Sequence, residues 1–116
     1  VRSSAASDVY KRQAKTKTTG RLLSEETAEA LGSMMRGAVV NQYGAWQFGS
    51  LTVCAKSGTA ERENGPADAM FAGFVEDEQY PLAFIVVVEN GGYGSATCVP
   101  VLSKVLAACK SVLDGE

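Results

Sequence analysis

Apolar side chains recur at helical spacing in two parts of the chain. The first part, residues 24–40, begins with a serine suited to cap a helix, followed by two glutamates that favour the N-terminal end of the helix dipole. The second part, residues 95–113, repeats the same spacing. Pro100 fits only the first turn of a helix, which puts the start of this second helix near residues 96–98. We therefore predict one helix in each part.

The pattern between these helices is that of strands. Residues 46–60 alternate apolar and polar side chains, residues 69–75 form a short apolar run, and residues 82–89 are rich in β-branched side chains. The connections are short, which favours antiparallel hairpins. We predict an α/β (α+β) fold, with a three-stranded antiparallel sheet flanked by the N- and C-terminal helices.

Charge is unevenly distributed along the chain. Residues 1–21 hold six of the eleven basic side chains and one acidic side chain, so the rest of the chain is strongly acidic. An acidic body repels phosphate backbones, and we expect no nucleic-acid partner. Residues 1–13, VRSSAASDVYKRQ, resemble a leader from sequencing read-through. We predict that residues 1–15 are a disordered or artefactual leader and that residues 16–116 form the folded part.

Several classes of chemistry are excluded by composition. Histidine is absent, which removes Ser-His-Asp and Cys-His catalysis and most transition-metal sites. The three cysteines are odd in number and form no C-x-x-C pair, so we expect no metal site, no disulfide framework and no cofactor. We expect that no apolar run is long enough to span a membrane. Any anchor of a parent protein should then lie outside this chain.

The strongest chemical motif is Lys56-Ser57-Gly58-Thr59, at the end of the first predicted strand. An extended peptide can add as a strand beside such an edge, where Gly58 lets another backbone approach closely. The hydroxyls of Ser57 and Thr59 can bind a terminal carboxylate, Lys56 supplies positive charge, and the Thr59 N–H can point at an oxyanion. The motif could equally be a solvated strand end, and four residues alone do not decide.

The sequence around this motif resembles one family. Residues 39–61, VVNQYGAWQFGSLTVCAKSGTAE, resemble the region of the K-[ST]-G-T-A-E motif in high-molecular-weight penicillin-binding proteins. Residues 70–75, MFAGFV, resemble their W-F-x-G-F strand, with Met70 in place of an aromatic residue, and residues 81–95 resemble the next strand and its exit loop. Because the elements follow in the family's order, the chain is similar to the C-terminal part of a class B D,D-transpeptidase.

The resemblance implies a role for each residue of the motif. Lys56 belongs to the active-site charge and proton network, and Ser57 and Thr59 contact the carboxylate of D-Ala-D-Ala or of a β-lactam. The Thr59 N–H is one of two oxyanion donors. The implied reaction is acyl transfer from the peptidoglycan stem peptide through an acyl-enzyme. The implied parent enzyme is extracytoplasmic and anchored to the bacterial cell membrane.

The family's nucleophile motifs are missing from the sequence. No serine has lysine three positions on or asparagine two positions on, so S-x-x-K and S-x-N are absent. We expect these motifs in a missing N-terminal part of the same domain, and expect the chain alone to be inactive and unlabelled by penicillin. We also expect both helices to cover one face of the sheet and the missing part to cover the other, so the isolated chain should be marginally stable.

Two alternatives remain at this point. The chain could be part of a serine β-lactamase, which shares the K-[ST]-G motif but hydrolyses the acyl-enzyme. It could also be a small non-catalytic α/β interaction module in which K-S-G-T is accidental. The G-T-A-E continuation and the W-F-x-G-F-like strand favour the transpeptidase over the lactamase.

Overall fold

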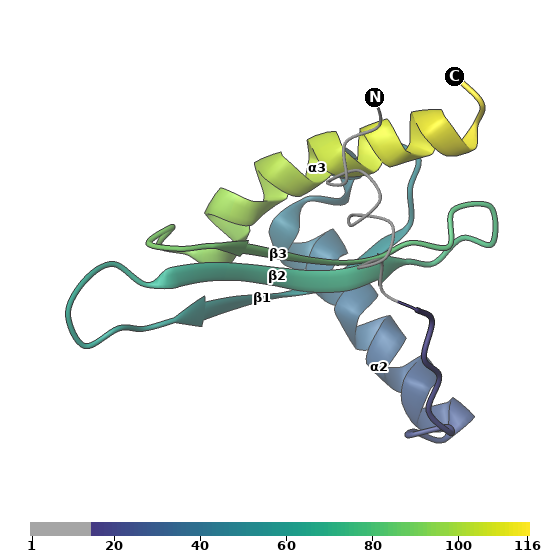
Figure 1. Ribbon diagram of the computed structural model, residues 1–116, viewed down its shortest axis with the longest axis horizontal. Helices are drawn as coiled ribbons and strands as arrows, with labels where there is room; N and C mark the ends of the chain where they lie inside the picture. Colours follow the sequence, from purple (N-terminus) through teal and green to yellow (C-terminus); the bar gives the residue numbers. More distant parts are fainter. Residues whose placement is uncertain (1–14) are drawn as a thin grey trace, which may run out of the picture.

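The computed structural model of the chain describes residues 15–116 (Figure 1). The predicted N-terminal leader, apart from Lys15, lies outside the described residues. The predicted α+β fold is confirmed, because two long helices flank a three-stranded antiparallel sheet. The elements in chain order are α2 (Glu25–Ala38), η1 (Val39–Tyr43), η2 (Ala45–Phe48), β1 (Val53–Ala60), β2 (Asp68–Val75), β3 (Ala83–Val88) and α3 (Gly94–Leu113).

The sheet has the strand order β1-β2-β3, so β1 is an edge strand. Both neighbouring pairs are antiparallel, as the short connections predicted. The K-S-G-T motif occupies the second half of β1, with Ser57 opposite Phe71 and Thr59 opposite Ala69 on β2. The side of β1 away from β2 pairs with no other strand of the described chain. The motif therefore lies on a sheet edge that a further strand could join.

The core lies between α3 and the sheet face that carries Phe71. Strand alternation places Val53, Ala55 and Phe71 on this face, and all three are fully buried. The ring of Tyr43, from η1, meets the Phe71 ring edge-on with the centroids 5.0 Å apart. The segment η1 therefore reaches the same side of the sheet as α3.

The helix α2 packs on the opposite side of the sheet, which differs from our expectation that both helices cover one face (Figure 1). A Cβ on Gly32 would lie 3.5 Å from the ring of Phe74, which shares its face with Cys54. Because α2 covers this side, Cys54 is as fully buried as its neighbours. The rest of the face is open, and Ile85 and Val87 on β3 are 66% and 51% exposed.

The predicted strand 46–60 begins later than expected. Residues 45–48 form the 3₁₀ helix η2, and β1 begins only at Val53. The backbone at Gly44 and Gly49, on either side of η2, has φ values of 90° and 60°, which favour glycine and interrupt an extended chain. Phe48 and Leu51 are both buried, at the three-residue spacing of a tight helical turn rather than the two-residue spacing of a strand.

The helix α3 (Gly94–Leu113) agrees with the predicted helix 95–113 to within one residue, but the start near residues 96–98 inferred from Pro100 is wrong. It starts at Gly94, so Pro100 lies inside the helix rather than in its first turn. An added Cβ on Gly94 would meet the Gly58 carbonyl oxygen at 2.2 Å, so only glycine can start the helix this close to β1. This contact, which the sequence pattern does not reveal, moves the start of the helix toward the N-terminus.

By length and composition α3 could cross a membrane. It has 20 residues and a mean hydropathy of 1.5, contrary to our expectation that no apolar run reaches that length. Its side chains Cys98, Val99, Leu102 and Leu106 are buried in the core, whereas Val105 and Val112 on the outer side are exposed. We interpret α3 as a core helix because this inner row of side chains packs on the sheet.

Candidate functional site

The K-S-G-T motif presents backbone groups to the open side of β1. The carbonyl of Val53 accepts from Arg36 at 2.9 Å, and the N–H of Ser57 donates to the Tyr43 hydroxyl at 3.0 Å. These partners show that every second residue of β1, counted from Val53, directs its N–H and C=O away from β2. Thr59 follows this alternation, so its N–H points to the same open side, beyond the part of the edge that Arg36 and Tyr43 cover.

The hydroxyl of Ser57 is held by Tyr43. The two hydroxyl oxygens are 2.8 Å apart, and the Tyr43 oxygen also accepts the Ser57 N–H. A tyrosine hydroxyl has one proton, which Tyr43 can therefore donate to the Ser57 oxygen. The Lys56 Nζ lies 3.5 Å from this oxygen and 2.9 Å from the Ser57 carbonyl oxygen, and is a donor to both. In this arrangement the proton of Ser57 is available to an outside acceptor.

The hydroxyl of Thr59 has a similar arrangement. Its oxygen accepts the N–H of Gly94, at the start of α3, at 3.2 Å. The hydroxyl proton of Thr59 is then also free to donate. Thr59 thus keeps its hydroxyl proton for a ligand, and Ser57 does so when Tyr43 is the donor of the bond between the two hydroxyls. Such a pair of donors suits an anion with two oxygens, such as a carboxylate.

Lys56 gives the motif its positive charge. The ion pairs of the described chain are Arg62–Asp68, at 2.6 Å, and Lys110–Asp114, at 2.5 Å, and neither involves Lys56. Within residues 15–116 its ammonium group is therefore not neutralised by a carboxylate. A lysine left in this state beside two hydroxyl donors favours an anionic ligand.

The pKa of Tyr43 reports the same electrostatic environment. Burial of the ring acts to raise this pKa, but the hydrogen bonds from Ser57 and the hydrogen bond and charge of Lys56 act against it. The net effect is a pKa below the ordinary value for tyrosine. The surroundings of the Tyr43 hydroxyl thus stabilise negative charge at the place where Ser57 would bind an anion.

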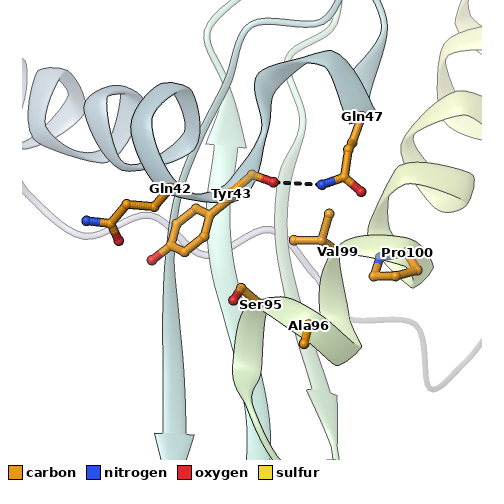
Figure 2. Close-up of a pocket in the computed structure, with 7 residues that line it drawn as sticks. All are labelled: Gln42, Tyr43, Gln47, Ser95, Ala96, Val99 and Pro100. Carbon is orange, nitrogen blue, oxygen red and sulfur yellow. Dashed lines mark hydrogen bonds between the residues drawn. The ribbon is translucent and has the colours of Figure 1, made fainter.

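One cavity is lined by Tyr43 and another by Thr59. One, of about 190 Å³, lies between η1, η2 and the start of α3 and is lined by Gln42, Tyr43, Gln47, Ser95, Ala96, Val99 and Pro100 (Figure 2). Within it the Gln47 side chain donates to the Tyr43 carbonyl at 2.7 Å and ties η2 to η1. The other, of about 170 Å³, is lined by Thr59, Glu61, Ala67, Gly92 and Tyr93. Of the four motif residues, Thr59 alone lines one of these cavities, whereas the first cavity reaches Tyr43, the partner of Ser57.

The four residues predicted as the site lie together on one edge of the sheet, as consecutive residues of β1. Their chemical roles remain predictions. A Cβ on Gly58 would meet the Met70 Cβ at 3.4 Å, an ordinary contact, so the close approach in this region is that of Gly94 to the Gly58 carbonyl. Sequence reasoning missed Tyr43 and Gly94. Tyr43 lies just beyond the predicted helix 24–40, and no spacing rule pairs it with a serine fourteen residues later.

No metal site accompanies these groups in residues 15–116, where no three His, Cys, Asp or Glu side chains are placed to hold an ion. The polar groups at the K-S-G-T edge are two hydroxyls, an ammonium group and backbone amides.

Comparison with known proteins gives one finding. The family model of the penicillin binding protein transpeptidase domain matches residues 2–107. No curated protein and no solved structure matches the chain. The matched region includes the K-S-G-T edge, all three strands and most of α3. The chain therefore belongs to the penicillin-binding protein transpeptidase family.

Proposed function

We propose that this chain is the substrate-binding part of a serine-type peptidoglycan D,D-transpeptidase. In this proposal the K-S-G-T edge binds the D-Ala-D-Ala end of a stem peptide and the β-lactams that mimic it. The observation that carries the proposal is the donor set on β1, in which the Thr59 hydroxyl proton is free, the Ser57 hydroxyl can donate when Tyr43 gives it a proton, and the Lys56 ammonium group pairs with no carboxylate of residues 15–116.

The open edge of β1 suggests how the substrate binds. An extended peptide lies beside residues 58–60 as an added strand, and its backbone pairs with the outward N–H of Thr59, because Tyr43 already holds the N–H of Ser57. Its terminal carboxylate accepts from Ser57 and Thr59 and is attracted by Lys56. The carbonyl to be attacked lies near the Thr59 N–H, which stabilises the negative oxygen as the tetrahedral intermediate forms.

The nucleophile comes from outside this sequence. The S-x-x-K and S-x-N motifs are absent, so acyl-enzyme formation requires the N-terminal part of the same domain. The chain alone is then inactive and forms no adduct with penicillin. The parent enzyme works outside the cytoplasmic membrane, to which it is anchored, because its substrate is the cell wall.

The proposal is tested by titrating the isotopically labelled 116-residue chain with N-acetyl-D-Ala-D-Ala, followed by NMR. We expect a dissociation constant of about 1 mM, since only part of the cleft is present. The amide signals of residues 56–60 should move most. The C-terminal amide of the same dipeptide should bind at least several-fold more weakly, because it lacks the charge that Lys56 and the two hydroxyls recognise. Equal affinity for the dipeptide and its C-terminal amide would contradict the proposal, and so would shifts of amide signals mainly outside residues 56–60.

Two variants locate the binding. The double variant Ser57→Ala/Thr59→Val removes both hydroxyls and should abolish the preference for the free carboxylate. The control variant Ser103→Ala removes a serine hydroxyl on the outer part of α3, which bonds only to the Pro100 carbonyl, and should bind as the unmodified chain does. Intact-mass measurement after incubation with penicillin should show no adduct, and a stable adduct would refute the predicted inactivity.

A further inference from the structure

The geometry points to Tyr43 as a positioning residue that orients the Ser57 hydroxyl proton toward the bound carboxylate. This inference rests on the proposed function, since it assumes that Ser57 donates to a carboxylate. It adds a residue outside the K-S-G-T motif, on a different element of the fold.

The hydrogen-bond inventory carries the inference. The Tyr43 oxygen is 3.0 Å from the Ser57 nitrogen and 2.8 Å from the Ser57 hydroxyl oxygen. An N–H is always a donor, so Tyr43 accepts the first bond and is free to give its own proton in the second. Ser57 then has its oxygen occupied and its proton free. A chain of bonds from Tyr43 through Ser57 to a carboxylate polarises each hydroxyl and strengthens the last bond.

The opposite arrangement is possible without a ligand. Ser57 can give its proton to Tyr43, whose oxygen then accepts two bonds. In that arrangement Ser57 has no proton for a carboxylate. An arriving carboxylate therefore selects the first arrangement, in which the phenol of Tyr43 is the donor. A phenylalanine at this position cannot support it, because its ring has no hydroxyl to hold the Ser57 oxygen.

Tyr43 is held in place by backbone and ring contacts that do not involve its hydroxyl. It ends the π-helical turn η1, in which the Gly44 N–H bonds to the Val39 carbonyl five residues earlier, at 2.9 Å. A π turn widens the helix and redirects the side chains at its end, and such turns are frequent at functional sites. The ring packs edge-on against Phe71, and the residue is only 8% exposed. Removing the hydroxyl alone should therefore leave the ring where it is.

A double-mutant cycle separates positioning from a merely structural role. Tyr43→Phe should weaken binding of N-acetyl-D-Ala-D-Ala about five-fold, the range of one hydrogen bond. In the Ser57→Ala background the same change should have no effect, because the hydroxyl it orients is gone. An unchanged affinity of Tyr43→Phe overturns the inference. An equal loss in the Ser57→Ala background also overturns it, because Tyr43 would then act directly or through the fold.

Tyr80→Phe is the matched control. Tyr80 is 7% exposed and loses an equivalent hydroxyl, but that hydroxyl bonds to Asp114, away from the site. Its affinity for the dipeptide should not change. The two proposals fail in different ways. If the unmodified chain does not bind the dipeptide, the proposed function falls; if it binds and Tyr43→Phe binds equally well, only the role of Tyr43 falls.

A second measurement applies if Tyr43→Phe does not fold. Incorporation of 3-fluorotyrosine at position 43 alone keeps the shape and the hydroxyl of this side chain but lets it ionise at lower pH, and it leaves Tyr93, in the cavity beside Thr59, unmodified. An ionised Tyr43 has no proton to donate, so it accepts the hydrogen bond of the Ser57 hydroxyl, and its negative charge repels the carboxylate of the ligand. Binding should therefore fall at a lower pH in the fluorinated chain. Lys56 is the charged group that faces the Tyr43 hydroxyl, and its side chain is the same in the fluorinated and unmodified chains. The neighbouring Phe71, Ser95 and Val99 do not titrate in this range. An unshifted pH profile overturns the inference.

Discussion

Two tyrosines in different parts of the fold have similar burial, but their pKa values are shifted in opposite directions. Tyr43, beside the K-S-G-T edge, is 8% exposed, and Tyr80, beside the end of α3, is 7% exposed. The hydrogen bond to the Asp114 carboxylate, at 2.6 Å, raises the pKa of Tyr80, and burial adds to the rise. Around Tyr43 the donors of Ser57 and Lys56 outweigh burial and lower the pKa.

The difference lies in whether the local charges are already paired. At the Tyr80 end, Lys110 bonds to Asp114 at 2.5 Å and lies 5.1 Å above the ring centroid of Tyr80, so a cation, a carboxylate and a phenol neutralise one another. At the Tyr43 end, Lys56 has no carboxylate within the described part of the chain. The first cluster is closed and serves to fix α3 on the sheet. The second has a cation and hydroxyl groups but no carboxylate among the described residues, and the proposed anion binding rests on this difference.

The largest effect on stability is expected at Gly94, where the start of α3 meets the K-S-G-T edge. In Gly94→Ala the new Cβ would meet two backbone carbonyl oxygens, of Gly58 at 2.2 Å and of Met70 at 2.6 Å, so the start of α3 must move. We expect a loss of about 2–3 kcal/mol in the free energy of unfolding, measured with urea. Gly37→Ala, where a new Cβ is 3.9 Å from its nearest neighbour, should be stabilising by about 0.5 kcal/mol. Similar losses in both variants would contradict the close approach at Gly94.

A smaller loss of stability is expected at the cluster of Tyr80, Lys110 and Asp114. Asp114→Asn removes the charge that pairs with Lys110 and weakens the acceptor of Tyr80. The urea midpoint should fall, by less than in Gly94→Ala, while binding of N-acetyl-D-Ala-D-Ala stays unchanged. Asp77→Asn removes the same charge from an exposed turn without an ion pair and should leave the midpoint unchanged. A change of binding in Asp114→Asn would show that the two ends are coupled.

Acid should remove the stability that the paired carboxylates of Asp68 and Asp114 contribute. The hydrogen bonds of Asp114 to Lys110 and of Asp68 to Arg62 hold the pKa of each carboxyl below its ordinary value. The stability they contribute is present above the unfolded pKa, about 3.9, and is lost as the pH falls through the lower folded pKa. Unfolding followed from pH 6 to pH 2 should show this loss below about pH 4. Asp114→Asn should reduce its size, and an unaltered acid profile would speak against the pairing.

The smallest effect is the order in which the two tyrosines ionise. Tyr43 should lose its proton at lower pH than Tyr80, which can be followed by NMR of the labelled phenol carbons. Lys56→Gln should raise the pKa of Tyr43 and leave that of Tyr80 unchanged, because the positive charge acts only at the first ring. Simultaneous ionisation of the two rings would remove the contrast between the ends.

The sequence predicted some elements of the fold closely and others wrongly. The strands 69–75 and 82–89 agree with β2 and β3 to within a residue at each end, because apolar and β-branched runs bounded by turns specify strands locally. The segment 46–52 was misjudged, since its alternation concealed a 3₁₀ turn that Gly44 and Gly49 make possible. The side of the sheet taken by α2 was also misjudged, because helical periodicity says that one face is buried but not against what.

The sequence by itself determined the order of the elements, the edge motif Lys56-Ser57-Gly58-Thr59 and the family, because these depend on residues that are neighbours along the chain. Only the tertiary structure decided which groups hold the two hydroxyls of that motif. Ser57 depends on Tyr43, fourteen residues earlier, and Thr59 depends on Gly94, thirty-five residues later. A hydrogen bond depends on distances of a few tenths of an ångström between atoms, and such distances are fixed only when η1 and α3 pack onto the sheet.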